Sequence, residues 1–169
     1  MRAFVLSLLF AAIAFAAPAQ AQNARATGAQ ILWYGVYEVG KTEKVTDPTS
    51  ATGTRFISSG VRRVGENTDR IAMRKDVRFG FAYKLSGSPA NGSAKITHFR
   101  KFPPPGLDDS SGRKSLTEER NFNFGISRTD LFTGFNLGDT EGMPEGVWVF
   151  QVTHNGRILA EKSFTLYRP

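Results

Sequence analysis

The stretch Val77-Arg78-Phe79-Gly80-Phe81-Ala82-Tyr83-Lys84-Leu85 decides the fold class. Its large apolar side chains stand at every second position, and the positions between them carry small or cationic side chains. Successive side chains of a strand point to opposite faces of a sheet, so this pattern predicts a half-buried strand. We expect this strand to span Asp76–Leu85.

The segment after this strand carries turn residues. Ser86–Gly92 contains Pro89 and the pair Asn91-Gly92, which favour a turn. Lys95–Phe102 should then return as the antiparallel partner of the first strand. A second hairpin is predicted at the C-terminus, where Trp148–Val152 alternates before Asn155-Gly156, a pair suited to a tight turn.

The remaining chain predicts more short strands separated by loops. Strands are expected at Ile31–Val39, Thr54–Ser58, Val61–Val64, Leu116–Ile126 and Leu131–Leu137, and loops at Lys41–Gly53, Gly65–Asp69 and Phe102–Ser115. Ser115 and Glu118 also fit a helix capping box, so a helix at the start of Leu116–Ile126 is an alternative. No long amphipathic helix is indicated after residue 21. About seven or eight short strands with frequent turns predict an all-β sandwich.

The N-terminus has the features of an export signal. Arg2 supplies the positive charge, Ala3–Ala17 is apolar or small apart from Ser7, and Ala19-Gln20-Ala21 is a small-x-small cleavage pattern. The apolar run is shorter than the ~20 residues that a membrane-spanning helix needs. We therefore expect cleavage after Ala21, with an uncleaved membrane anchor as the alternative, and no transmembrane segment after cleavage.

These observations divide the chain into three parts. Residues 1–21 are expected to be a signal peptide, 22–29 a flexible leader and 30–169 one β-sandwich domain. The chain has no cysteine, so no disulfide can stabilise the domain even in an oxidising compartment. An alanine-rich signal without any cysteine points to a bacterial protein that is periplasmic or secreted.

Two stretches of the sequence resemble a known family. Tyr34-Gly35-Val36-Tyr37 near the start, and Pro144–Phe150 with Leu159–Phe164 near the end, are similar to a bacterial family of secreted immunoglobulin-like domains of unknown function. The resemblance implies an immunoglobulin-like antiparallel β-sandwich. It implies no activity and no catalytic residue, and the Cys-Trp-Cys core of antibody domains is absent.

The charge distribution suggests a binding surface. The formal net charge is +7, and the segment from Arg55 to Arg78 contains seven basic and three acidic residues. The candidate ligand-binding residues are Arg55, Arg62, Arg63, Arg70, Arg74, Trp33 and Tyr37. For an exported protein we expect an anionic envelope glycan or lipid, or another envelope protein, as the partner, and no nucleic acid. The alternative is a solvated face whose charge serves solubility.

Two sequence strings resemble catalytic or nucleotide-binding motifs by coincidence. Gly35–Thr42 satisfies G-x-x-x-x-G-K-T, but its middle is typical of a strand and places a carboxylate where phosphate would lie. Ser111–Lys114 satisfies S-x-x-K, but the glycine inside it and the prolines before it predict a surface turn. We expect neither nucleotide binding nor a serine nucleophile.

Histidines and carboxylates supply no convincing catalytic set. His98 is expected to be packed or at the solvent edge of a strand, and His154 to be exposed beside the Asn-Gly turn. The adjacent Glu118 and Glu119 should point to opposite faces of a strand, so they cannot flank one glycosidic bond. A weak calcium site is conceivable in the loop that carries Asp139, Glu141 and Glu145.

The sequence therefore indicates no catalytic residue, no metal ligand set and no cofactor. The favoured function is a non-enzymatic, exported envelope interaction or accessory module that uses a basic face. The alternative is an envelope hydrolase or calcium-dependent enzyme whose site assembles from distant loops.

Overall fold

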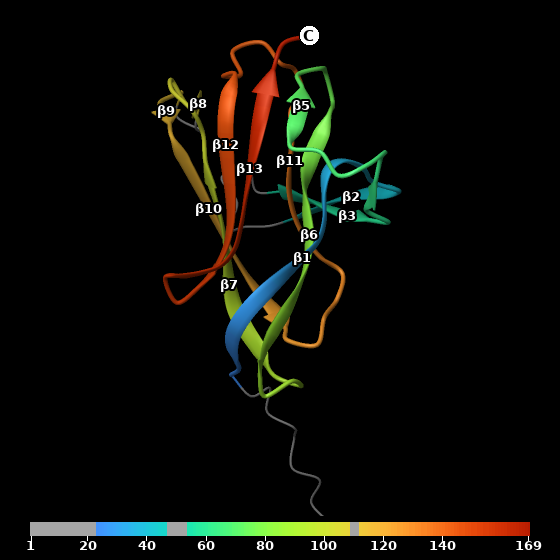
Figure 1. Ribbon diagram of the computed structural model, residues 1–169, viewed down its shortest axis with the longest axis vertical. Coiled ribbons are helices and arrows are strands. Elements are labelled where there is room, and N and C mark those ends of the chain that lie inside the picture. The colour runs from blue at the N-terminus through green and yellow to red at the C-terminus, as the bar shows by residue number, and fades with distance from the viewer. Residues whose placement is uncertain (1–22, 47–53, 109–111) are drawn as a thin grey trace, which may run out of the picture.

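The computed structural model describes residues 23–46, 54–108 and 112–169. All regular elements in these ranges are strands, and two of the sheets face each other as a sandwich (Figure 1). One sheet has four strands in the order β11 (Leu131–Asn136), β6 (Arg78–Ser88), β1 (Arg25–Glu38) and β4 (Arg62–Arg63). The other has five, in the order β10 (Thr117–Gly125), β7 (Ser93–Lys101), β12 (Gly146–His154), β13 (Arg157–Tyr167) and β5 (Arg70–Ala72).

Two short hairpins lie outside the two main sheets. β2 (Lys41–Thr46) pairs with β3 (Thr54–Ser59), and β8 (Leu107–Asp108) pairs with β9 (Lys114–Ser115). The β2–β3 hairpin projects to the side of the sandwich (Figure 1). All strand pairs between named elements are antiparallel except β13 with β5, which is parallel.

The core lies between the two main sheets and is rich in aromatic rings. Phe79, Phe81 and Tyr83 of β6 are fully buried, as the sequence predicts, but Gly80 and Ala82 between them are buried as well because the outer face is covered there. The ring of Phe79 lies 5.7 Å from Trp148 of β12 and 5.3 Å from Phe164 of β13, measured between ring centroids. One aromatic cluster therefore joins both sheets.

The hairpin predicted between β6 and β7 is wrong. β6 pairs with β1 and β11 in the four-stranded sheet, whereas β7 pairs with β10 and β12 in the five-stranded sheet. The chain thus crosses from one sheet to the other at residues 89–92. Both strands have an apolar face, and the crossing lets these faces pack against each other across the core instead of lying side by side.

Several element boundaries also differ from expectation. β1 begins at Arg25, so residues 25–29 belong to the sheet and not to a flexible leader. β2 occupies part of the loop expected at Lys41–Gly53, and β5 was not predicted at all. No apolar alternation marks these segments, because residues 25–29 and β5 each bury only one residue, Ala26 and Ile71, and β2 lies in an outlying hairpin.

The segment around residues 102–126 departs further from the prediction. The expected loop Phe102–Ser115 contains β8 and β9, and it places Phe102 in the core. The alternative helix near residue 116 is wrong, because β10 begins at Thr117 and pairs with β7 along its length. The C-terminal hairpin is confirmed, with positive φ angles of 50° at Asn155 and 76° at Gly156.

In the part of the chain that the structure describes, no helix is long and apolar enough to cross a membrane.

Candidate functional site

The outer face of the four-stranded sheet is built by alternation along three neighbouring strands. Because Phe79, Phe81 and Tyr83 point into the core, the residues between them on β6 point outward. The pairing register then aligns two outward rows across β1, β6 and β11, namely Trp33–Ala82–Phe132 and Gly35–Gly80–Gly134. A row of aromatic and small side chains thus lies beside a row of three glycines.

Three aromatic rings pack on these rows and form what we call the aromatic cluster. The ring centroid of Phe132 lies 5.6 Å from that of Trp33 and 4.4 Å from that of Tyr37. A Cβ atom added at Gly134 would overlap the Phe132 ring and approach Cε1 of Tyr37 to 2.8 Å. The rings therefore lie down against the glycine backbone, and this leaves Trp33 and Phe132 half-buried and Tyr37 only 8% exposed.

Basic side chains surround the aromatic cluster. Arg78 and Lys84 occupy outward positions of β6 on either side of Ala82, and Arg63 of β4 is the register partner of Tyr37. No carboxylate stands at an outward-facing position of β1, β6 or β11 within the described residues. We call the aromatic cluster together with Arg63, Arg78 and Lys84 the cationic aromatic face.

Tyr37 adds no negative charge to this face. Burial raises the pKa of the Tyr37 phenol to about 12, against the opposing positive charges of Arg100 and Arg78. The phenol therefore stays neutral at physiological pH, and the charge of the face comes from its basic residues.

The structure separates the residues that the sequence groups together. Arg63 joins Trp33 and Tyr37 on the cationic aromatic face, where it also donates a hydrogen bond of 2.6 Å to Asn67 Oδ1. Arg62 forms an exposed ion pair of 2.6 Å with Glu38. The side chain of Arg55 lies outside the described residues.

Arg70 and Arg74 lie elsewhere. Arg70 is exposed while its neighbour Ile71 is buried, so Arg70 points outward from the five-stranded sheet, where its guanidinium lies 5.4 Å from the ring centroid of Tyr167. Arg74 follows β5 and is exposed. The seven predicted residues therefore do not form one patch.

Phe132 and Lys84 belong to this face although neither was predicted to do so, and Arg78, which ends the predicted basic stretch, was not among the candidate ligand-binding residues. The sequence alternation along Leu131–Leu137 could have indicated Phe132. Leu131 and Thr133 point into the core, so Phe132 between them must point to the outer face of the strand. That Phe132 meets Trp33 depends on the pairing of β11 and β1 on either side of β6, which no local pattern encodes.

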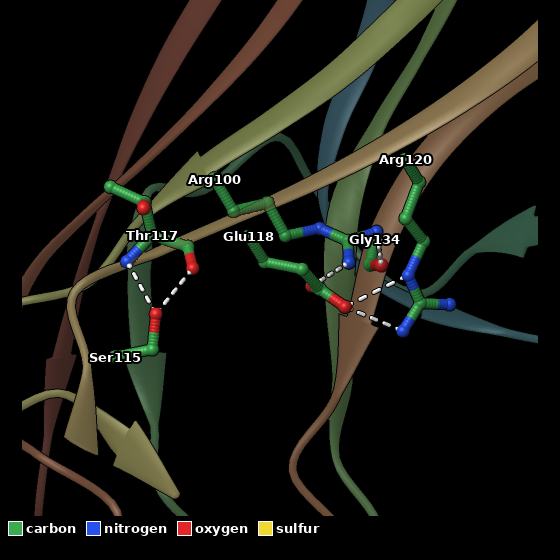
Figure 2. A network of polar contacts seen from close by, with 6 residues as sticks. All are labelled: Arg100, Ser115, Thr117, Glu118, Arg120 and Gly134. Carbon is green, nitrogen blue, oxygen red and sulfur yellow. Dashed lines mark hydrogen bonds and ion pairs between the residues drawn. The ribbon is translucent and has the colours of Figure 1, made fainter. Parts of the chain in front are cut away.

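A second cluster of charged groups links β7, β10 and β11, with Arg100 buried, Glu118 half-buried and Arg120 exposed (Figure 2). Arg100 of β7 faces the core, where its Nη1 donates to Glu118 Oε2 at 2.5 Å and its Nη2 donates to the carbonyl of Gly134 at 2.7 Å. Arg120 donates to Glu118 Oε1 at 2.6 Å. Burial alone would raise the pKa of Glu118, but the charges and hydrogen bonds of Arg100 and Arg120 hold it below its usual value.

This network is explained by the architecture. β10 and β11 are the outermost strands of their sheets, and an exposed strand edge invites pairing with another chain. Arg100 donates a hydrogen bond to a main-chain carbonyl of the edge strand β11. Glu118 and Arg120 place charges on the inner face of the edge strand β10. The network thus protects two edges and links the two sheets. Glu118 is half-buried and Glu119 exposed, as expected for opposite faces of one strand.

The histidines are structural. His98 is buried, with Nε2 2.7 Å from the Tyr83 hydroxyl, and burial together with Arg100 and Arg120 lowers the pKa of His98 to about 3. The exposure expected for His154 is wrong: it is 8% exposed, and its Nδ1 donates to the carbonyl of Lys95 at 2.8 Å. The ring packs back against β7 instead of extending with the turn.

The other candidate sites find little support. A cavity of about 440 Å³ lies near the start of β1, and no carboxylate lines it; its lining residues are Asn23, Ala24, Arg25, Ser93, Ala94, Lys95, His154 and Asn155. Within the described ranges, no group of three His, Cys, Asp or Glu side chains could hold a metal ion. Glu145 of the conceivable calcium loop is paired with Arg168 at 3.2 Å.

The two coincidental strings also have structural explanations. Gly35–Thr42 runs from β1 into β2 and forms no loop before a helix. Ser111 lies outside the described residues, while Lys114 belongs to β9 and pairs with Asp108 at 2.9 Å.

Comparisons with known proteins agree with this fold. A crystal structure of an immunoglobulin-like protein from Pseudomonas aeruginosa is similar to this chain, with a TM-score of 0.57 and 21% sequence identity. The similarity covers 88% of this chain and 99% of that one. No curated protein matches the chain. The model of the family described as "Domain of unknown function (DUF3859)" matches residues 26–166. The chain therefore belongs to the DUF3859 family, and its fold is an immunoglobulin-like β-sandwich.

Proposed function

We propose that this protein is a non-enzymatic module of the bacterial envelope that binds an anionic envelope component through the cationic aromatic face. The proposal combines the export expected from residues 1–21 with the surface that the fold assembles. Arg63, Arg78 and Lys84 are the basic residues on which it depends.

The proposal rests on one observation: the charged side chains of this face are all positive. The outer face of the four-stranded sheet has basic residues and no carboxylate on its three long strands. The outer face of the five-stranded sheet is mixed, because Lys95 and Lys101 alternate there with Glu119 and Glu161 of neighbouring strands. A surface of a single sign attracts a polyanion, whereas a mixed surface does so weakly.

Binding of this kind depends on salt. Exposed charges are screened over ~8–10 Å at physiological ionic strength, so affinity for a polyanion should fall as salt rises. The partly buried aromatic cluster supplies an apolar component that salt screens less.

The first test is thermal melting of residues 22–169, which include every described residue, with polygalacturonate, polyphosphate and phosphatidylglycerol vesicles. A ligand that binds the folded form raises the midpoint by mass action. We expect at least one polyanion to raise it at low salt and to lose its effect at high salt. Lys84→Gln and Arg78→Gln should reduce this shift.

The matched control is Lys101→Gln, because Lys101 is an exposed lysine on the opposite outer face. It should leave the shift unchanged. Equal losses in Lys84→Gln and Lys101→Gln would mean that general charge, and not this face, governs binding. The absence of any shift with all three polyanions would refute the proposal.

A further inference from the structure

We infer that the ligand of the cationic aromatic face is an acidic polysaccharide, with a sugar ring stacked on Trp33 and Phe132 and its acidic groups paired with Arg78 and Lys84. This inference rests on the proposed function and names the chemical class of the ligand. Three features of the face support it.

The first feature is the orientation of the rings. Gly80 and Gly134 lie side by side on β6 and β11, and their missing side chains leave room for Phe132 to lie against the backbone. The ring centroids of Trp33 and Phe132 lie 5.6 Å apart and their planes differ by 33°, so the two rings form a tilted, partly overlapping apolar platform. A pyranose ring has a flat face of C–H groups that can be buried on such a platform, while its hydroxyl groups stay in water.

The second feature is the position of the charges. Lys84 and Arg78 lie six residues apart on β6, with Ala82 and Gly80 between them. At the rise of a strand this separates their backbones by roughly 20 Å. A ligand that reaches both cations while covering the rings must be extended, which indicates a chain of sugars and not a single one.

The third feature distinguishes a polysaccharide from a membrane surface. Membrane-binding elements insert large apolar side chains below the headgroups. Here the rings lie against the sheet, Tyr37 is buried, and Trp33 and Phe132 are half-buried. Rings in this position favour stacking on a ligand over insertion below headgroups, although Leu32 beside Trp33 is exposed; the vesicle arm of the experiment below separates the two.

Phe132 also has a structural role, because an aromatic ring that covers glycines in a sheet stabilises the pairing. The test therefore relies on Trp33, which packs on the edge of this arrangement. Trp33→Ala is compared with Phe99→Ala, which removes a half-buried ring from the outer face of β7. Melting of both variants without ligand shows whether they fold.

The experiment measures the affinity of residues 22–169 for polygalacturonate, polyphosphate, neutral dextran and phosphatidylglycerol vesicles. We expect polygalacturonate to bind more tightly than polyphosphate, since polyphosphate has charge without sugar rings. Trp33→Ala should weaken polygalacturonate binding by roughly tenfold and leave polyphosphate binding unchanged, and Phe99→Ala should change neither. Arg78→Gln should weaken both.

A second measurement needs no variant at Trp33. Trp148 is fully buried in the core, so a change in tryptophan fluorescence on adding polygalacturonate would report on Trp33. The inference is overturned if polyphosphate or vesicles bind as well as polygalacturonate and Trp33→Ala has no effect; the proposed function would then survive. If none of the anionic probes binds, the proposed function fails as well.

Discussion

At the scale of single residues, the molecule depends on polar side chains that face the core and find partners in the opposite sheet. His98 of β7 contacts the hydroxyl of Tyr83 on β6, and Arg100 of β7 donates to the carbonyl of Gly134 on β11. A buried polar group is costly unless it is hydrogen-bonded. These contacts therefore favour one arrangement of the two sheets over alternatives that would leave the same groups unpaired.

Removing Glu118 should be strongly destabilising. The Arg100 side chain is 7% exposed, and Glu118→Ala would leave its charge buried without a carboxylate partner. We expect a loss of about 3 kcal/mol in the free energy of unfolding, measured by urea denaturation. The exposed neighbour provides the control, since Glu119→Ala should change stability by less than about 0.5 kcal/mol. Similar effects of the two substitutions would contradict the role given to Arg100.

His98 should make stability depend on pH in a defined direction. Its pKa is lowered from 6.5 to about 3 in the folded protein, first by burial and then by Arg100 and Arg120. Below pH 6.5 the unfolded chain takes up a proton that the folded state does not bind. The contribution of His98 to the free energy of unfolding is therefore fully present above that pH. It declines as the pH falls toward 3, by up to about 1.4 kcal/mol per pH unit.

Between pH 7 and pH 5 this amounts to about 2 kcal/mol, a range in which few ordinary carboxylates titrate. His98→Gln keeps a polar group beside Tyr83 and should remove most of this decline in urea denaturation. An unchanged pH dependence in the variant would show that His98 does not become charged on unfolding in the way we describe.

At the scale of elements, the row of three glycines determines how β1, β6 and β11 present their outer face. A Cβ atom at Gly134 would meet the Phe132 ring, one at Gly80 would meet the backbone of β11, and one at Gly35 would meet Thr68. Gly134 is therefore needed for close packing of Phe132 and Gly80 for the close approach of the β11 backbone, and neither is needed for a turn or an unusual φ angle.

Gly134→Ala should destabilise the sheet by about 1–3 kcal/mol, because the new methyl group overlaps the Phe132 ring. The cost should fall in the Phe132→Ala background, where that ring is absent; urea denaturation of the single and double variants measures the coupling. Gly125→Ala in β10 is the control, since nothing lies within 4 Å of the added methyl group and little loss is expected. Equal costs in both backgrounds would show that Phe132 is not the obstacle.

At the scale of the whole molecule, the chain passes repeatedly between the sheets, so neither sheet has a core of its own. β6 and β7 are consecutive but belong to opposite sheets, as do β11 and β12. The two sheets are also tied at the side away from Arg100, where Lys162 of β13 lies 4.0 Å from the Tyr34 ring centroid and 3.2 Å from Asp69.

Unfolding should therefore be one cooperative transition. In a Trp33→Phe variant the remaining tryptophan, Trp148, reports on the core, while circular dichroism reports on the strands of both sheets. We expect the two urea transitions to coincide. A fluorescence transition at lower urea than the dichroism transition would mean that one sheet persists after the shared core is lost.

The sequence by itself determined the fold class, the buried face of β6 and the C-terminal hairpin, because alternation and Asn-Gly turn chemistry are local properties of a few neighbouring residues. It also indicated Trp33, Tyr37 and Arg63, three members of the candidate face. The tertiary structure alone decided that β6 and β7 lie in different sheets, that His154 is buried, and that Arg70 points away from the other arginines. It also decided that Phe132, Arg78 and Lys84 join Trp33. The physical reason is that alternation indicates which side chains must be buried but not which strand will cover them. Pairing register and sheet order bring distant side chains onto one face, and both are set by the packing of the whole core.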